Sequence, residues 1–377
     1  MNEPESLTQV DRTRVLCKGR KLSYFAGCDY FRLASHPAII EAVGEGLRKY
    51  GLNVAASRVT TGNHALYREL ENALARYFDA DAALVVPCGY ASNSVAAQAL
   101  RGAFTHAVID AKAHMSLRDA SLMLGCPVLE FKSRDPEDLR RVLARAGKNI
   151  KPILLTDSVF TYESEVAPVA EYLKILGSRG MILLDDAHGA GILGEKGRGV
   201  LELAGVSRRR VIQTMTLSKA FGVYGGAILG SSELRGKMFS GSRIFTGSTP
   251  LPLPLVYAGL RAVELVAKDK SLRRRLAGNV TRVKTALRAA GYPVALTPVP
   301  VAAVTPTSSA HEAILRKRLL ARGVFPSFIN YPGGPSETYL RIVISSEHTS
   351  EQLDNLLGAL DFLAERGSRP HIGRADD

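Results

Sequence analysis

The sequence predicts an α/β fold in which a large, mostly parallel sheet is followed by a smaller α+β domain. Three observations lead to this prediction. From about residue 80, short apolar runs alternate with segments of helical period, as in sheets buried between two layers of helices. One link between two such runs is too short to hold a helix. The last hundred residues lose the alternation and mix strand-like with helix-like segments.

Before the alternating region, the segment SHPAIIEAVGEGLRKYG predicts a helix. Ser35 can cap its N-terminus, Pro37 suits its first turn, and Gly51 can end it. We therefore expect an N-terminal helix that precedes the sheet.

The sheet strands are predicted from six apolar runs: ALVVP, HAVIDA, PVLEF, PILLTD, MILLDD and VIQTMT. Helical periods such as PEDLRRVLARA and APVAEYLKILGSRG separate them, so these strands should run parallel. Only LSKAFGVYG lies between VIQTMT and the next apolar run, GAILG. That link cannot form a helical crossover, so GAILG should be antiparallel to its neighbour.

The C-terminal part is predicted to begin with helices over about residues 250–290. Two strands, VAAVTP and YLRIVIS, and two further helices follow. Thr349 and Gln352 have the spacing of a capping box at the start of the last helix.

Composition excludes several classes of function. The formal charge is +13, but the basic runs Arg208–Arg210 and Arg273–Arg275 are not interleaved with aromatic residues, so nucleic-acid binding is not expected. No apolar stretch approaches the roughly 20 residues that span a bilayer. The polar N-terminus shows no secretory signal, and the four cysteines form no CxxC pair. We therefore expect a cytoplasmic protein.

The stretch ILLDDAHGAGILG contains the spacing G-x-G-x-x-G at Gly189, Gly191 and Gly194. A dinucleotide site is disfavoured, because four residues separate the strand from the first glycine and EKGRGV after the third is a poor helix. A glycine-rich turn without a ligand is an alternative. A metal site is another, although Asp185 and His188 would supply only two ligands.

Asp185 instead indicates a positively charged partner, since a carboxylate at the end of an apolar strand is costly to bury alone. A pyridinium nitrogen is such a partner. In TLSKAFG, Lys219 lies among apolar and small residues, which would lower its pKa and free its amine for imine chemistry. Thr216 and Ser218 can donate hydrogen bonds to a phosphate. Asp185, His188 and Lys219 together are typical of a pyridoxal-phosphate site.

Six segments, in order, resemble motifs of the α-oxoamine synthases, which are fold-type I pyridoxal-phosphate (PLP) enzymes. The segments are FAGCDYFRLASHP, SRVTTGNHALYRELE, PCGYASN, DDAHGAGILGEKGRG, TLSKAFGVYGG and YLRIVISSEHTSEQLD. The resemblance implies a large three-layer domain with a seven-stranded, mostly parallel sheet. It also implies an N-terminal segment (1–45) that packs with the small domain, a PLP-binding large domain (46–270) and a C-terminal small domain (271–377).

The resemblance implies four catalytic residues, which would also bind PLP. Lys219 would bond to the cofactor and move protons, and Asp185 would hold the pyridine nitrogen. His188 would bond the ring hydroxyl, and His114 would stack on the ring face.

The remaining binding residues follow by the same comparison. Gly89, Tyr90 and Thr216 would border the phosphate, and Thr161 would lie near the ring. Ser248 and Thr249 would reach the phosphate of the neighbouring subunit, which implies a homodimer with sites at its interface. Arg341 would bind the substrate carboxylate. Cys28 occupies a substrate-side position where the family has asparagine. No metal is implied.

The activity implied is a decarboxylative condensation. A small L-amino acid, such as alanine or glycine, would join an acyl-CoA or another acyl thioester to give an α-amino ketone. Members that make 8-amino-7-oxononanoate are the nearest parallel. Another PLP reaction on the same fold, such as transamination, is the alternative, and a non-catalytic or dinucleotide-binding protein is the third hypothesis.

Overall fold

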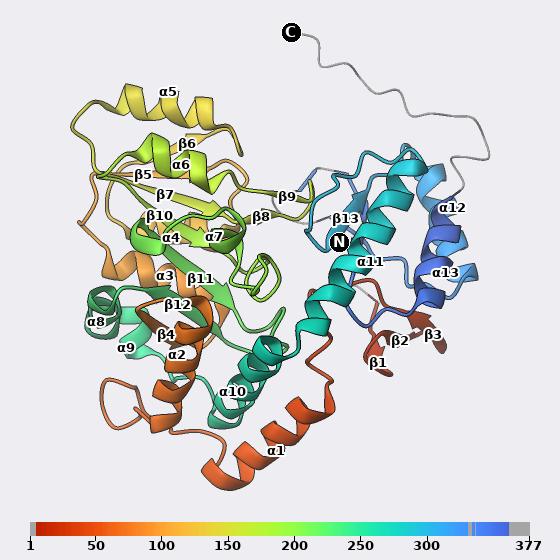
Figure 1. Cartoon of the computed structure of the whole chain (residues 1–377), viewed down its shortest axis with the longest axis horizontal. Coiled ribbons are helices and arrows are strands. Elements are labelled where there is room, and N and C mark those ends of the chain that lie inside the picture. Colours follow the sequence, from red (N-terminus) through yellow and green to blue (C-terminus); the bar gives the residue numbers. More distant parts are fainter. Residues whose placement is uncertain (1–4, 331–333, 336, 362–377) are drawn as a thin grey trace.

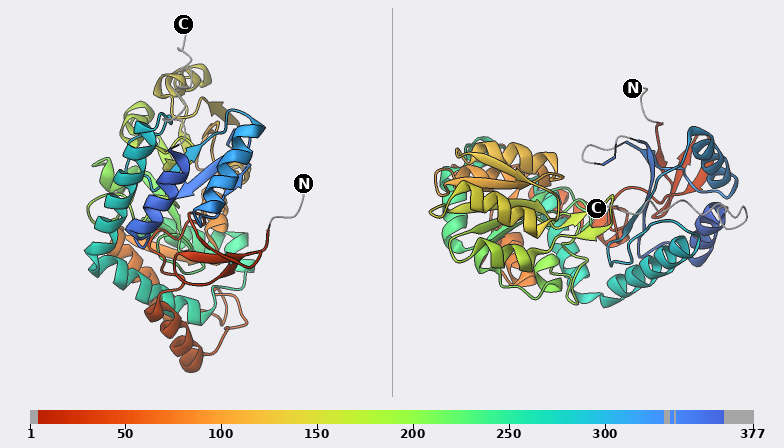
Figure 2. Two further views of the ribbon diagram at one scale, coloured as in Figure 1. Left: turned by 90° about the vertical axis from the view of Figure 1, so that its right-hand side faces the viewer. Right: turned by 90° about the horizontal axis from the view of Figure 1, so that it is seen from above.

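The computed structural model describes residues 5–330, 334–335 and 337–361 of the chain. Two lobes are visible: the yellow and green elements form one, and the blue C-terminal elements, with the red N-terminal strands beside them, form the other (Figure 2). Within the described residues, no helix is both long enough and apolar enough to cross a bilayer.

The larger lobe is built on a sheet of seven strands among the described residues, in the order β4-β12-β11-β10-β7-β5-β6 (Figure 1). All neighbours pair in parallel except at β12, which is antiparallel to β11 and to β4. The predicted strands and the antiparallel GAILG are therefore confirmed. The bounds are β4 (Ala82–Val86), β5 (His106–Asp110), β6 (Val128–Phe131), β7 (Pro152–Asp157), β10 (Met181–Asp185), β11 (Val211–Thr216) and β12 (Gly226–Gly230).

Helices cover both faces of this sheet, which gives the three layers that were predicted. Successive strand residues point to opposite faces. Accordingly, Ile153 and Leu155 of β7 pack with the helices of one face and Leu154 with those of the other. The first face carries α3 (Gly89–Ala99), α4 (Met115–Met123), α8 (Ser232–Gly241) and α9 (Arg243–Gly247). The second carries α2 (Ala65–Phe78), α5 (Pro136–Ala146), α6 (Val169–Leu176), α7 (Val200–Leu203) and α10 (Leu253–Lys268).

In its described residues, the smaller lobe combines an antiparallel sheet, ordered β13-β15-β14, with three helices. The last helix begins with the predicted capping box of Thr349 and Gln352. The elements are α11 (Lys270–Ala289), β13 (Val301–Val304), α12 (Ser309–Ala321), β14 (Phe328–Ile329), β15 (Tyr339–Val343) and α13 (Ser350–Leu360). Two short elements of the larger lobe lie outside its seven-stranded sheet: a hairpin of β8 (Val159–Phe160) with β9 (Glu165–Val166), and a 3₁₀ turn at Arg208–Arg210.

The N-terminal strands β1 (Thr8–Gln9), β2 (Arg14–Cys17) and β3 (Arg20–Ser23) lie against the smaller lobe. The amide of Ser23 donates to the Gly323 carbonyl at 2.7 Å. Helix α1 (Pro37–Tyr50) instead packs along α10. The division at residues 45 and 270 stays a prediction.

One detail of α1 corrects the sequence prediction. The N-cap is His36, not Ser35, and its Nδ1 accepts a hydrogen bond from the Ala38 amide at 3.2 Å. The reason is that Pro37 is the first helical residue, so the cap position falls directly before it. Gly51 ends the helix as predicted, with a φ of 73°.

Candidate functional site

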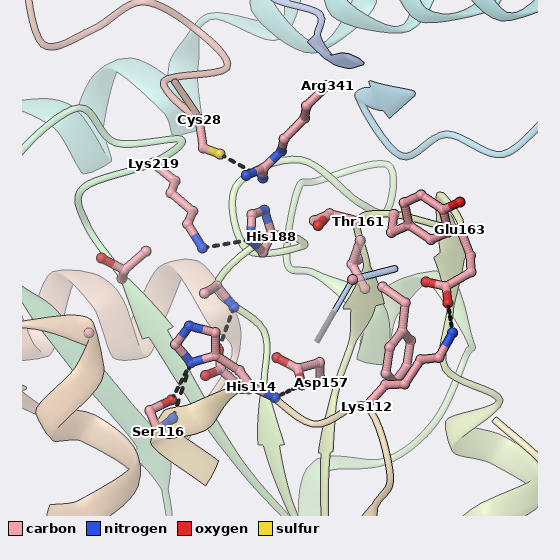
Figure 3. A pocket seen from close by; sticks show the side chains of 18 of the residues that line it. Cys28, Lys112, His114, Ser116, Asp157, Thr161, Glu163, His188, Lys219 and Arg341 are labelled. Atoms are coloured by element: carbon pink, nitrogen blue, oxygen red, sulfur yellow. Dashed lines mark hydrogen bonds and ion pairs between the residues drawn. The ribbon is translucent and has the colours of Figure 1, made fainter. Parts of the chain in front are cut away.

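A cavity of about 340 Å³ opens at the carboxyl ends of the central strands, where residues of both lobes meet (Figure 3). Parallel sheets of this kind place ligands at this edge. Ten residues predicted for the site line it: Cys28, Gly89, Tyr90, His114, Thr161, Asp185, His188, Thr216, Lys219 and Arg341. Ser248 and Thr249 do not line it. Ser248 follows α9 and donates its hydroxyl to the Ile244 carbonyl at 2.5 Å.

Lys219 lies in the short connection between β11 and β12, which holds its side chain over the cavity. Its Nζ is 2.8 Å from Nε2 of His188. Burial lowers the pKa of Lys219 below its usual range, and the nearby Arg341 guanidinium adds to that effect. The arrangement offers an amine that gives up its proton more readily than a surface lysine does.

Asp185 ends β10, and two donors hold its carboxylate. Asn93 Nδ2 donates to Oδ2 at 2.7 Å, and the Ala187 amide donates to Oδ1 at 3.0 Å. Asn93 is itself fixed, because its Oδ1 accepts a hydrogen bond from the Thr214 hydroxyl at 2.6 Å. The orientation of Asp185 is thus set before any ligand binds.

A second carboxyl group, Asp157, lies opposite Asp185 in the parallel pair of β7 and β10. Burial, aided by the charge of Asp185, raises the pKa of Asp157 well above its usual range. Its Oδ2 accepts a hydrogen bond from the His114 amide at 2.7 Å. Asp157 therefore fixes the start of α4 and leaves Asp185 as the carboxylate that can face a cationic group.

Two histidines flank the cavity, and burial lowers the pKa of both. His114 is the N-cap of α4, with Nδ1 2.8 Å from the Ser116 hydroxyl. For His188 the pKa falls well below its usual range, and the positive charges of Lys219 and Arg341 add to the burial effect. Both rings are therefore neutral near pH 7.

The N-terminus of α3 forms another wall of the cavity. No side chain of the described residues caps it, and Gly89 is its first residue. A Cβ at Gly89 would lie 2.7 Å from Cβ of Thr216, so only glycine lets the helix end approach β11 this closely. Amides at a helix N-terminus attract anions. A phosphate-sized anion would find its donors here.

The smaller lobe contributes Arg341 from β15. Its Nη2 is 3.3 Å from Sγ of Cys28 (Figure 3). A guanidinium that points into a cavity is suited to bidentate binding of a carboxylate. Arg341 and Lys219 thus face the same space from different lobes.

The glycine motif after Asp185 makes room for a buried carboxyl group. A Cβ at Gly189 would lie 2.1 Å from Oδ1 of Asp186. Asp186 is fully buried, accepts from Gln213 Nε2 at 2.5 Å, and has a pKa that burial raises to about 7.

No group of three His, Cys, Asp or Glu side chains suited to a metal ion occurs in the described parts of the chain.

Sequence reasoning missed three residues that hold other residues of the site in place: Tyr30, Asn93 and Asp157. Tyr30 Oη is 2.6 Å from Nδ1 of His188. A signal existed for two of them. Asn93 lies one helical turn after Gly89, and Asp157 ends a strand, as Asp185 does. Tyr30 gave no such signal, because it meets His188 only when two segments far apart in the sequence pack together.

Comparisons with known proteins agree in family and fold. The family model for aminotransferase class I and II matches residues 29–360. The 8-amino-7-oxononanoate synthase of Thioalkalivibrio sulfidiphilus is 33% identical over 346 residues, which are 91% of this chain and 88% of that protein. The protein of the same name from Methylococcus capsulatus is 32% identical, over 92% of this chain and 90% of its own length.

Among solved structures, the Sphingomonas wittichii serine palmitoyltransferase superimposes with a TM-score of 0.88. The two sequences are 25% identical, and the match covers 97% of this chain and 93% of that one. The whole fold, both lobes included, is therefore shared with that enzyme.

Proposed function

Because the chain belongs to the class I and II aminotransferases and, within them, to the α-oxoamine synthases, we propose that it is a PLP-dependent C-acyltransferase. It would condense a small L-amino acid, such as alanine or glycine, with an acyl-CoA or another acyl thioester. Loss of carbon dioxide would leave an α-amino ketone, as in 8-amino-7-oxononanoate synthase. The observation that carries this proposal is that Lys219, Asp185 and Arg341 line one cavity.

The residues present fit PLP. Gly89, Tyr90 and Thr216 would hold the phosphate, because the N-terminus of α3 has no capping side chain among the described residues and glycine at 89 allows close approach. Asp185 would hold the pyridine nitrogen, with its carboxylate oriented by Asn93.

The rest of the ring would be held from three sides. His188 would bond the ring hydroxyl, His114 would stack on the ring face, and Thr161 would flank it. When bound, PLP supplies an aldehyde carbon that bonds to amines and a protonated ring that draws electrons from the reacting carbon.

The protein's own groups would bind the substrate and move its proton. Arg341 would bind the carboxylate of the amino acid and so orient the bond that breaks. Lys219, whose pKa is lowered by burial, would take the α-proton of the substrate and later return a proton to the product. Cys28 contacts Arg341 and would border the amino acid.

We further propose a cytoplasmic homodimer. Ser248 and Thr249 would each reach the phosphate site of the partner subunit, which accounts for their position outside the cavity of their own chain. Support for the compartment comes from the four cysteines, none of which forms a disulfide.

Two inactive variants, Lys219→Ala and Thr249→Arg, should regain activity when mixed and allowed to exchange subunits. Failure of exchanged subunits to regain activity would count against shared sites.

Release of free thiol tests the proposed reaction. Purified protein loaded with PLP is mixed with each pair from a panel of small amino acids and a panel of acyl-CoAs. We expect thiol release with at least one pair, dependent on both substrates and absent in Lys219→Ala. Conversion of PLP to pyridoxamine phosphate by an amino acid alone, with no thiol release from any pair, would favour an aminotransferase instead.

A further inference from the structure

Tyr30 is a fully buried tyrosine that contacts His188, a residue of the site. It lies between β3 and α1 and is not among the side chains that line the cavity. Its Oη is 2.6 Å from Nδ1 of His188, and Nε2 of the same ring is 2.8 Å from Lys219 Nζ. Tyr30, His188 and Lys219 therefore form a continuous chain of polar contacts that ends in the cavity.

The protons in this chain can be assigned from chemistry. Burial raises the pKa of Tyr30 well above its usual range, so its hydroxyl keeps its proton. His188 is neutral because its pKa is lowered well below 6.5, and a neutral imidazole carries one N–H and one acceptor nitrogen. The partner of one ring nitrogen decides which nitrogen carries the proton.

We propose that Tyr30 is a positioning residue. Its hydroxyl donates a hydrogen bond to Nδ1 of His188 and so keeps the ring proton on Nε2. Nε2 is the nitrogen that faces Lys219 and the cavity. This inference rests on the proposed function, in which His188 donates to the ring oxygen of PLP. With the proton on Nδ1 instead, His188 would present a lone pair to that oxygen and repel it.

The backbone of Tyr30 adds a second link. Its carbonyl accepts a hydrogen bond from the Ser346 amide at 2.9 Å, shortly after β15, the strand that carries Arg341. Tyr30 thus ties the orientation of His188 in the larger lobe to the strand that carries the proposed carboxylate-binding arginine.

Nitrogen-15 NMR of ring-labelled histidine reads the tautomer directly in protein loaded with PLP, where Lys219 would be bonded to the cofactor and would not donate to Nε2 as an ammonium. The chain has 8 histidines, and the His188 signals are identified by their loss in His188→Asn. We expect a protonated Nε2 and an acceptor-type Nδ1 in the native protein. Tyr30→Phe keeps the ring and removes the donor, so we expect a mixture of tautomers and a roughly tenfold weaker affinity for PLP.

Tyr292→Phe is the matched control. Its hydroxyl is also buried and donates to a carbonyl, that of Leu360 at 3.0 Å, but within the smaller lobe. It should leave both the His188 signals and the PLP affinity unchanged. For Tyr30→Phe we expect kcat to fall roughly tenfold with little change in KM for the amino acid.

A native protein with the His188 proton on Nδ1 would overturn the inference, and so would a Tyr30→Phe variant with unchanged His188 signals. If that variant failed to fold, the native tautomer alone would decide. The tautomer is read whether or not the protein turns over any substrate pair. Failure of the proposed reaction is therefore distinguishable from failure of this inference.

Discussion

Gly89 is the residue whose lack of a side chain most directly shapes the proposed phosphate site. A Cβ there would lie 2.7 Å from Thr216 Cβ and 2.9 Å from its Oγ1. We expect Gly89→Ala to push the start of α3 away from β11 and to weaken PLP binding at least tenfold. The reason is that the backbone amides at the N-terminus of α3 would no longer point at the phosphate. A titration of cofactor-free protein with PLP, followed by absorbance, measures this.

Gly278 supplies the control for that substitution. It lies exposed on α11, and a Cβ there would meet nothing within 4 Å. Gly278→Ala should leave the PLP affinity unchanged and raise the free energy of unfolding by up to about 1 kcal/mol. Native-like PLP affinity in Gly89→Ala would be inconsistent with a phosphate at the N-terminus of α3.

At the scale of single residues, the sequence could predict the side chains that face the cavity but not those that orient them. Lys219 and Asp185 stand out because a charge among apolar neighbours needs a partner. Asn93 and Tyr30 act only through other side chains, and their contacts depend on how α3 and the N-terminal segment pack. The contact of Tyr30 leaves no pattern along the chain, whereas Asn93 could have been noticed from its place one helical turn after Gly89.

Glu71 of α2 connects three elements through one buried carboxylate. Its oxygens accept from Arg58 Nη1 at 2.5 Å, from Arg235 Nη2 of α8 at 2.6 Å and from the Val85 amide of β4 at 3.1 Å. Glu71→Ala would leave the guanidinium of Arg58, itself nearly inaccessible to solvent, without this partner. We expect the free energy of unfolding to fall by about 3–5 kcal/mol in urea titrations.

An exposed ion pair on α8 provides the comparison. Glu233 and Lys237 are mostly solvent-accessible, so Glu233→Ala should barely change the free energy of unfolding. If Glu71→Ala were as mild as Glu233→Ala, Glu71 would not hold α2, β4 and α8 together.

At the scale of elements, the sheet was the most predictable part of the fold. Its strands lie between two helical layers, so their side chains are apolar on both faces and stand out in the sequence. The nine-residue link LSKAFGVYG also predicted the antiparallel β12 correctly. Helix ends were harder, because several neighbouring residues can cap: His36 took the place expected for Ser35, and Asp269 starts a new helix within a region predicted only as helical.

Lys284 links the two lobes through a buried ammonium. From α11 its Nζ donates to Oγ of Ser164, in the β8–β9 hairpin, at 2.6 Å and to Oγ1 of Thr297 at 2.9 Å. Burial lowers the pKa of Lys284 from 10.5 to about 7. Between these values the unfolded chain binds more protons than the folded one, so this group makes stability rise with pH from about 7 to 10.5.

We therefore expect Lys284→Met to flatten the rise in unfolding free energy above pH 7, measured by urea titration at several pH values. Asp186 has the opposite effect at lower pH. Its pKa is raised from 3.8 to about 7, so this group makes stability fall as pH rises from 3.8 to about 7. That range lies below the one in which Lys284 acts. The exposed Lys317 of α12 is the control, and Lys317→Met should keep the native slope. An unaltered slope in Lys284→Met would rule out this role.

For the whole molecule, the alternation of strands and helices predicted the lobe that carries Lys219. The last hundred residues, in which strand-like and helix-like segments mix, predicted the lobe that carries Arg341. How the lobes meet could not be predicted, because the contact depends on residues far apart in sequence, such as Tyr30 with His188 and Lys284 with Ser164. The candidate site exists only where the two lobes come together.

Lys219 is the residue proposed to carry the cofactor, and borohydride reduction followed by peptide mapping identifies that residue. Reduction of the PLP-loaded protein makes the bond between lysine and cofactor permanent, and mass spectrometry then locates the added pyridoxyl phosphate group. We predict the group on the peptide that contains Lys219, and none after reduction of Lys219→Ala. A group on another lysine, or an unmodified Lys219 in the reduced PLP-loaded protein, would show that Lys219 does not carry the cofactor.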